Sequence, residues 1–174
     1  MLRKSWQPPL RQKMLKLQRV DRPVRVAIVG IGHELRGDDA VGVALAHSLK
    51  KFVSGNENLL VICAGAAPEN CAGQLRRFAP DYVLLLDAAN MGEEPGKVKW
   101  LSLEHASGLS ASTHSLPLSI FGHYLKKELG CEVVLLGIQP ASISVGTQLS
   151  PSVMASVEEV AESLADILLM KQAT

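Results

Sequence analysis

The sequence Val-Arg-Val-Ala-Ile-Val-Gly at residues 24–30 indicates a strand that is buried on both faces. It is short and rich in β-branched residues, and a glycine closes it, which is typical of a strand inside a parallel sheet. A turn rich in glycine and aspartate follows, after which Val41, Leu45 and Leu49 recur at helical spacing. The stretch therefore predicts a buried strand that leads through a turn into a helix.

The same alternation of strand and helix continues along the chain. Four further strands are expected, at residues 59–63, 82–87, 97–101 and 132–138, of which the run at 97–101 is weaker and suits a sheet edge. Three further helices are expected, at residues 68–78, 116–125 and 150–168. Because helices alternate with strands that are apolar on both faces, we expect an α/β fold: a three-layer sandwich with a mainly parallel twisted sheet of about five strands flanked by helices.

The chain has 174 residues, a length that suits one domain at about 100–200 residues per domain. Its composition, 47% hydrophobic and 20% charged, is that of a globular protein. No stretch reaches the roughly 20 apolar residues of a membrane-spanning helix, and no charged start leads into a secretory signal pattern. Three cysteines without a C-x-x-C pair favour buried thiols over a disulfide framework or a zinc knuckle. We therefore expect a cytoplasmic protein.

Charge is distributed unevenly along the chain. Residues 1–23 hold seven bases and one acid, which leaves 11 bases and 16 acids in residues 24–174. An acidic body argues against nucleic-acid binding. We expect residues 1–23 to be a basic, poorly ordered N-terminal extension of a single α/β domain at residues 24–174. The helical spacing of Leu10, Met14 and Leu17 leaves a second interpretation, a small surface helix that docks on an acidic partner or anionic lipid.

Ionisable residues follow the predicted strands at the end where α/β folds bind ligands. In open α/β sheets that end is the carboxyl edge, where loops lead into helix N-termini. Asp38 and Asp39 come after the first strand, Asp87 ends the third, and His114 lies just ahead of the third helix. We expect these side chains to meet on one rim. Two carboxylates and an imidazole suit a borderline divalent metal such as zinc or nickel and leave coordination positions open.

Each of these residues also has a structural role open to it. An aspartate at a helix start, such as Asp38, is commonly an N-cap, and an aspartate that ends a strand, such as Asp87, can accept hydrogen bonds from loop amides. A single histidine before a helix, such as His114, is usually structural. Together they favour a site, because one rim would otherwise collect three partly buried ionisable groups without a paired base.

Three common catalytic motifs are disfavoured. The third glycine of a dinucleotide-binding G-x-G-x-x-G falls on Leu35, and two acids follow where a pyrophosphate needs positive potential. The P-loop motif does not occur in the sequence. Ser112 stands where the nucleophile elbow of a serine hydrolase needs its last glycine.

The run Gly-Ile-Gly-His-Glu-Leu-Arg-Gly-Asp-Asp-Ala-Val-Gly at residues 30–42 resembles the opening motif G-x-G-N-x-L-x-x-D-D/E-G-x-G of the [NiFe]-hydrogenase maturation endopeptidases. The likeness continues, in the same order, at residues 65–70, 86–92, 112–117 and 136–140, and covers about residues 24–170. Its last two segments are most similar to the branch that processes the large subunit of the hydrogenase associated with formate hydrogenlyase. Several matched segments in one order make the resemblance specific.

The resemblance implies an endopeptidase that removes the C-terminal extension of a [NiFe]-hydrogenase large-subunit precursor after nickel insertion. The family's metal ligands match Asp39, Asp87 and His114. The nickel would belong to the precursor, so no tightly bound metal is expected, although zinc, cadmium or another divalent ion could occupy the site. A water polarised by nickel, or deprotonated by Asp38 or a ligand carboxylate such as Asp39, would attack the peptide. We expect a monomer.

Two positions depart from the family motif. His33 replaces an asparagine, and it either adds a nitrogen to the rim or only replaces a hydrogen bond of that asparagine. Ala40 replaces a glycine, and it is strained if that glycine takes a positive φ but unstrained if the helix begins earlier. The family usually begins at the first strand, so residues 1–23 have no counterpart in it.

Two other classes of function remain open at this point. One is a metal-dependent hydrolase with its own zinc and a small substrate, which would purify with stoichiometric metal. The other is a non-catalytic nickel-sensing chaperone, which would bind the precursor without shortening it.

Overall fold

The computed structural model describes residues 5–17, 21–106, 109, 111 and 116–169. Within these residues, five strands form one sheet in the order β2-β1-β3-β5-β4. The parallel strands are β1 (Val26–Ile31), β2 (Leu59–Gly65), β3 (Tyr82–Ala88) and β5 (Glu132–Ile138), and β4 (Val98–Leu101) is antiparallel to β5. The predicted strands are present, and the weaker run at 97–101 corresponds to the edge strand β4.

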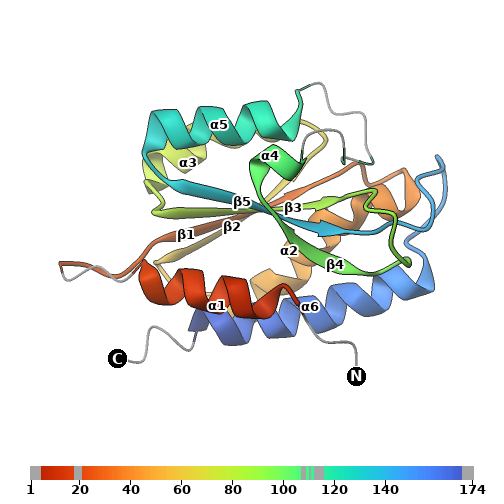
Figure 1. Ribbon diagram of the computed structural model, residues 1–174, viewed down its shortest axis with the longest axis horizontal. Coiled ribbons are helices and arrows are strands. Elements are labelled where there is room, and N and C mark those ends of the chain that lie inside the picture. Colours follow the sequence, from red (N-terminus) through yellow and green to blue (C-terminus); the bar gives the residue numbers. More distant parts are fainter. Residues whose placement is uncertain (1–4, 18–20, 107–108, 110, 112–115, 170–174) are drawn as a thin grey trace.

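Helices cover both faces of the sheet and give the three layers that the sequence predicts (Figure 1). One face carries α1 (Gln7–Lys16), α2 (Val41–Val53) and α6 (Pro151–Leu169). The other face carries α3 (Ala72–Phe78), α4 (Leu103–Ala106) and α5 (Leu118–Leu129). The short 3₁₀ helices η1 (Gly37–Ala40) and η2 (Pro68–Cys71) precede α2 and α3. Among the described residues, no helix combines the length and apolar character that crossing a membrane requires.

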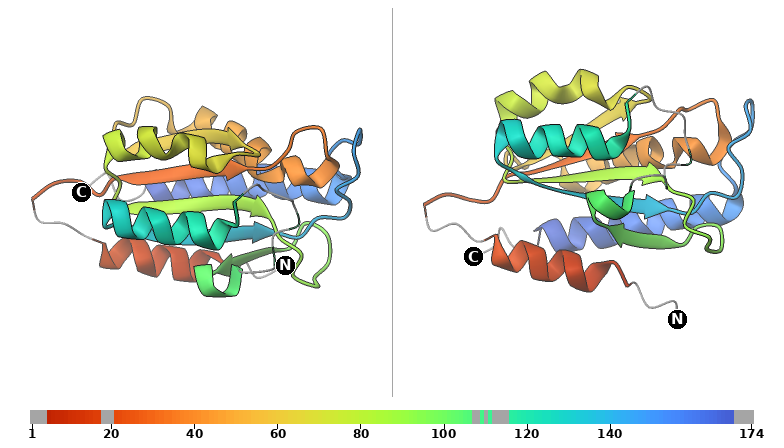
Figure 2. Two further views of the ribbon diagram at one scale, coloured as in Figure 1. Left: turned by 90° about the horizontal axis from the view of Figure 1, so that it is seen from above. Right: turned by 45° about the horizontal axis from the view of Figure 1, so that its top comes forward.

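The sheet separates two apolar cores, because successive side chains of a strand point to opposite faces. In β1, Val26 and Ile28 join the core under α2 and α6, whereas Ala27 and Val29 join the core under α3 and α5. Every residue of β1 is buried, as a central strand of a parallel sheet requires. Figure 2 shows the helical layers on either side of these strands in two further orientations.

The N-terminal extension contains a packed helix where we expected a poorly ordered tail. The exposed fractions of Trp6, Leu10 and Met14 are 3%, 0% and 4%, and the three side chains join the core that contains α6. Because they are spaced by four residues, they form one stripe along α1. The expectation of poor order is therefore wrong for Gln7–Lys16. The helix of the second interpretation is present, and its apolar side chains pack into the core of this domain.

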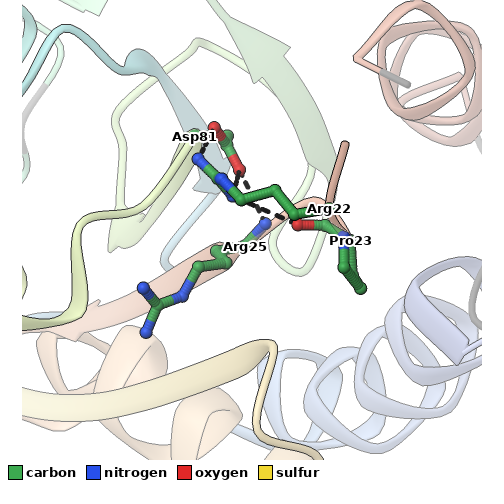
Figure 3. A network of polar contacts seen from close by, with 4 residues as sticks. All are labelled: Arg22, Pro23, Arg25 and Asp81. Carbon is green, nitrogen blue, oxygen red and sulfur yellow. Dashed lines mark hydrogen bonds and ion pairs between the residues drawn. The ribbon is translucent and has the colours of Figure 1, made fainter. Parts of the chain in front are cut away.

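An ion pair holds the chain between α1 and β1 to the start of β3 (Figure 3). Arg22 donates two hydrogen bonds to Asp81, from Nη1 to Oδ2 and from Nη2 to Oδ1, both 2.8 Å long. The amide of Arg25 donates to the same Oδ2 at 2.8 Å. This paired contact fixes the point at which the chain enters the sheet, because a bidentate arginine–carboxylate pair specifies orientation as well as distance.

Candidate functional site

Glycines allow the turn between β1 and α2 to lie against the ends of β1 and β3. A Cβ on Gly42, in the first turn of α2, would lie 2.1 Å from Leu86 O in β3. A Cβ on Gly32 would lie 1.7 Å from Asp39 O, and a Cβ on Gly30 would lie 2.3 Å from Gly42 O. Since no side chain fits at these distances, the glycines of the opening motif permit this close approach of backbone to backbone.

Asp39 is held in this turn with one carboxylate oxygen unused by the protein. Its exposed fraction is 1%. Oδ2 accepts a hydrogen bond from His33 N (3.1 Å), whereas the buried Oδ1 has no hydrogen-bond partner among the described residues. Such oxygens are uncommon in folded proteins, because they have lost their hydration without a replacement. The Oδ1 atom of Asp39 is therefore a candidate ligand for a bound cation.

Asp87 lies at the same edge of the sheet. It belongs to β3, is fully buried, and is paired with Gly137 of β5. In the neighbouring strand β1, the last residue paired with β3 is Gly30, which lies opposite Leu86. Asp87 is the next residue of β3 after that pair. It therefore lies beside the point where β1 ends and the chain turns toward Asp39. The two carboxylates belong to one carboxyl edge of the sheet.

His114 lies outside the described residues. The described chain on its N-terminal side reaches the same edge, because Ala111 N donates to Ala88 O (3.2 Å), one residue after Asp87. On its C-terminal side, α5 begins at Leu118. Within the part of the chain that the structure describes, no three His, Cys, Asp or Glu side chains are grouped to hold a metal ion. A site with three ligands therefore needs a donor from elsewhere, and His114 remains a prediction for it.

Asp38 contacts the loop between β5 and α6. It is fully buried, and its carboxylate accepts hydrogen bonds from Ala141 N (2.8 Å), Ser142 N (3.1 Å), Ser150 N (2.6 Å) and Ser150 Oγ (3.0 Å). From the sequence, Asp38 is expected to cap its own helix or to act as a general base. The first expectation is wrong, because the two oxygens accept hydrogen bonds from a distant loop and the helix that follows has no side-chain cap. Asp38 therefore positions that loop against the turn, and its role as a general base stays a prediction.

The two departures from the family motif have structural explanations. His33 Nδ1 accepts a hydrogen bond from Leu35 N (3.2 Å), as an asparagine side chain at this place could. Nδ1 is therefore used inside the loop, and a place for the other ring nitrogen, Nε2, on the rim stays a prediction. Ala40 has a φ of −73°, because the chain becomes helical at η1, and the positive φ (56°) falls on Gly37. Ala40 is therefore unstrained.

Gln139 is a buried polar residue whose role the sequence does not reveal. Its exposed fraction is 7%. Oε1 accepts hydrogen bonds from Met91 N (2.7 Å) and Glu93 N (3.2 Å), and Nε2 donates to Asn90 Oδ1 (3.3 Å). Gln139 thus fixes the loop that follows Asp87. The sequence offers one signal, a glutamine directly after an apolar strand, but its partners are 46 to 49 positions away.

Comparisons with known proteins agree with this architecture. The sequence model of the family described as HycI, hydrogenase maturation protease, matches residues 43–167 of the chain. The chain belongs to this family. The Hydrogenase 3 maturation protease of Escherichia coli strain K12 is 33% identical over 135 residues, which cover 77% of this chain and 85% of that one.

Solved structures of HycI proteases have the same fold. The crystal structure of a [NiFe] hydrogenase maturation protease HycI from Thermococcus kodakarensis matches with a TM-score of 0.77 at 37% identity, covering 84% of this chain and 93% of that one. The solution structure of an endopeptidase HycI from Escherichia coli matches with a TM-score of 0.70 at 29% identity, covering 80% and 88%. The α/β fold and the enzyme class expected from the sequence are confirmed: this HycI family member is a hydrogenase maturation protease.

Proposed function

We propose that this protease removes the C-terminal extension of a [NiFe]-hydrogenase large-subunit precursor after nickel insertion, and that Asp39, Asp87 and His114 bind the nickel of that precursor. The observation that carries the proposal is the buried Oδ1 of Asp39, which has no hydrogen-bond partner among the described residues. It lies at the carboxyl edge of the sheet that Asp87 shares. Family membership supplies the hydrogenase precursor as substrate.

The chemistry of these donors suits a metal that arrives with the substrate. Two carboxylates and one imidazole are a donor set that nickel and zinc accept. Three ligands leave coordination positions open, so ligands of the precursor can stay bound to the same ion. The nickel then serves as a mark of a loaded precursor, and a precursor without it lacks that attachment point. The protease needs no metal of its own for this selection.

Hydrolysis follows from holding the scissile peptide beside the bound nickel. Proximity of this kind can contribute up to about 7–11 kcal/mol in well-oriented systems. A water, polarised by nickel or deprotonated by Asp39, adds its oxygen to the peptide carbonyl carbon. The tetrahedral intermediate then collapses, the peptide C–N bond breaks, and the leaving nitrogen takes up the proton that the water gave. The products are a new C-terminal carboxylate on the large subunit and a released peptide with a free amine.

The test compares nickel-loaded with nickel-free precursor. The purified protein is mixed with each large-subunit precursor encoded in its own genome, and the mass of the product is measured. We expect shortening of one precursor, and only in its nickel-loaded form. Equal shortening without nickel would refute the selection by nickel, and stable binding without shortening would support a nickel-sensing chaperone instead.

The metal content of the purified protein gives a second test. We expect well below one metal ion per chain, because the nickel arrives with the precursor. One zinc ion per chain that activity requires would support a metal-dependent hydrolase with its own zinc.

We further propose that the protease acts in the cytoplasm as a monomer. The free state of its cysteines, Cys63, Cys71 and Cys131, supports a reducing compartment.

A further inference from the structure

Leu35 and Val145 are the most exposed large apolar side chains among the described residues. Their exposed fractions are 68% and 75%, and the other exposed large apolar residues of the described chain lie between 38% and 61%. Leu35 belongs to the turn between β1 and α2, and Val145 belongs to the loop between β5 and α6. Both loops leave the carboxyl edge of the sheet, where Asp39 lies.

The two loops are fixed to each other by main-chain hydrogen bonds. Gly146 N donates to Leu35 O (2.8 Å), and Gly37 N donates to Thr147 O (3.1 Å). A Cβ on Gly37 would lie 2.5 Å from Thr147 Oγ1, so the contact leaves no room for a side chain. These bonds place Leu35 and Val145 on one continuous piece of surface that the fold holds in place.

Two hydroxyl groups of the loop between β5 and α6, those of Ser142 and Thr147, donate hydrogen bonds within that loop. Ser142 Oγ donates to Ser144 Oγ (3.0 Å), and Thr147 Oγ1 donates to Ser144 O (2.7 Å). Val145 follows Ser144 and presents an exposed apolar side chain, and exposed polar residues, Glu34 and Gln148, lie near the two apolar side chains along the chain. Leu35 and Val145 are therefore the apolar part of a surface with a polar surround.

We propose that Leu35 and Val145 form an apolar contact pair that binds the hydrogenase large-subunit precursor through apolar side chains near its cleavage site. The inference rests on the proposed function, and it adds the part of this surface that recognises protein rather than metal. The turn that carries Leu35 also supplies His33 N to Asp39, so a precursor that reaches the carboxylate meets this turn. Because the loops are already ordered, binding costs little further conformational entropy.

The test separates precursor binding from the chemical step. The double variant Leu35→Ser/Val145→Ser should raise KM for nickel-loaded precursor by about tenfold or more and leave kcat within about twofold. The matched control is Leu15→Ser/Phe52→Ser, because those side chains are 61% and 45% exposed and belong to α1 and to the last turn of α2. The control should change neither constant.

A conservative double variant and a measurement of thermal unfolding accompany the KM comparison. Leu35→Met/Val145→Ile keeps the apolar contact and should restore KM. Thermal unfolding should give similar melting temperatures for all variants, since exposed substitutions have small effects on stability. If the double variant does not fold, the single variants Leu35→Ser and Val145→Ser give the same KM-against-kcat comparison.

Three results would overturn this inference. One is an unchanged KM in the folded double variant, and another is a fall in kcat alone. The third is a dimer of the unmodified chain in sedimentation that is absent from the double variant. The pair would then bind a second copy of the chain. These measurements use a precursor that the unmodified protein shortens. If no precursor is shortened, the proposed function fails, and that outcome is distinct from the three results above.

Discussion

Asp38 and Ser150 are 112 positions apart and are joined by two hydrogen bonds, from Ser150 N to Oδ1 (2.6 Å) and from Ser150 Oγ to Oδ2 (3.0 Å). Asp38 immediately precedes Asp39, and Ser150 immediately precedes α6. A buried carboxylate therefore connects the candidate site to the start of the last helix. Hydrogen bonds to a charged acceptor are stronger than neutral ones. This connection should therefore stabilise the fold and hold the turn that carries Asp39 against the start of α6.

Replacing Asp38 by asparagine should lower the free energy of unfolding by about 2–4 kcal/mol, because the new amide group meets N–H donors and leaves them unsatisfied. Processing should slow as well, because the turn that carries Asp39 loses an anchor. Urea unfolding measures the first effect. Asp166→Asn makes the same chemical change at an exposed position of α6 and should alter stability by at most about 0.5 kcal/mol. Equal stability of the two variants would contradict the positioning role.

Two leucines of α1 test whether the N-terminal extension is part of the folded domain. Leu10 is fully buried, whereas Leu15 is 61% exposed. Leu10→Ala should lower the free energy of unfolding by about 2–5 kcal/mol, because it leaves a cavity in the core. Leu15→Ala should change it by at most about 0.5 kcal/mol. Denaturant unfolding of both variants checks this, and equal small effects would mean that α1 does not contribute to the core.

The strands could be predicted because a buried parallel strand has a direct signature, an apolar run without alternation. Residues 82–87 show it, and β3 (Tyr82–Ala88) is buried throughout. The order of α1 could not be predicted in the same way, because its stripe is sparse and lies among many charges. The core that it joins includes Tyr82 and residues of α6, which come much later in the chain.

The candidate site could also be predicted from the sequence only in part. That Asp39 and Asp87 belong to one edge follows from topology, because the carboxyl ends of parallel strands lie together. The role of Asp38 does not follow, since its donors lie 103 to 112 positions away in a loop. Two adjacent aspartates look alike in the sequence, and only the packing of that loop distinguishes the positioning residue from the candidate ligand.

The buried thiols should titrate unusually late. Burial raises the pKa of Cys71 to about 11 and the pKa of Cys131 to about 11, with desolvation of the thiolate as the largest cause. Cys63 is exposed, so the variant Cys63→Ser leaves the two buried thiols alone. Its ultraviolet thiolate absorbance should rise near pH 11 when folded and near the ordinary pH of about 8.5 when unfolded in urea. Folded-state titration near the ordinary value would show that the thiols are accessible.

The raised pKa values of Cys71 and Cys131 predict the direction in which the free energy of unfolding changes with pH. Below the unfolded thiol pKa both states keep their protons, so Cys71 and Cys131 cause no pH dependence there. Above it the unfolded state loses protons first, and the free energy of unfolding should fall until the folded pKa of about 11 is reached. Urea unfolding across this range measures the slope. Cys71→Ser/Cys131→Ser should show a smaller slope.

Asp39→Asn should have the opposite stability signature from Asp38→Asn. Removing a buried charge whose Oδ1 has no hydrogen-bond partner among the described residues should leave the free energy of unfolding unchanged or raise it by up to about 2 kcal/mol. Processing of nickel-loaded precursor should fall by at least about a hundredfold, because a ligand is lost. Urea unfolding and product mass measured on the same preparation check both signs. A strong loss of stability would assign Asp39 to the fold rather than to the site.

His114→Ala should abolish processing of nickel-loaded precursor, because the proposed nickel site loses its nitrogen ligand. The control is His123→Ala, which removes an exposed imidazole that contacts Ser119 O within α5 and should leave processing unchanged. Product mass after incubation with each variant gives the readout, and urea unfolding shows that both variants are folded. Full turnover by the folded His114→Ala variant would remove His114 from the ligand set. The nitrogen donor would then have to come from the precursor itself.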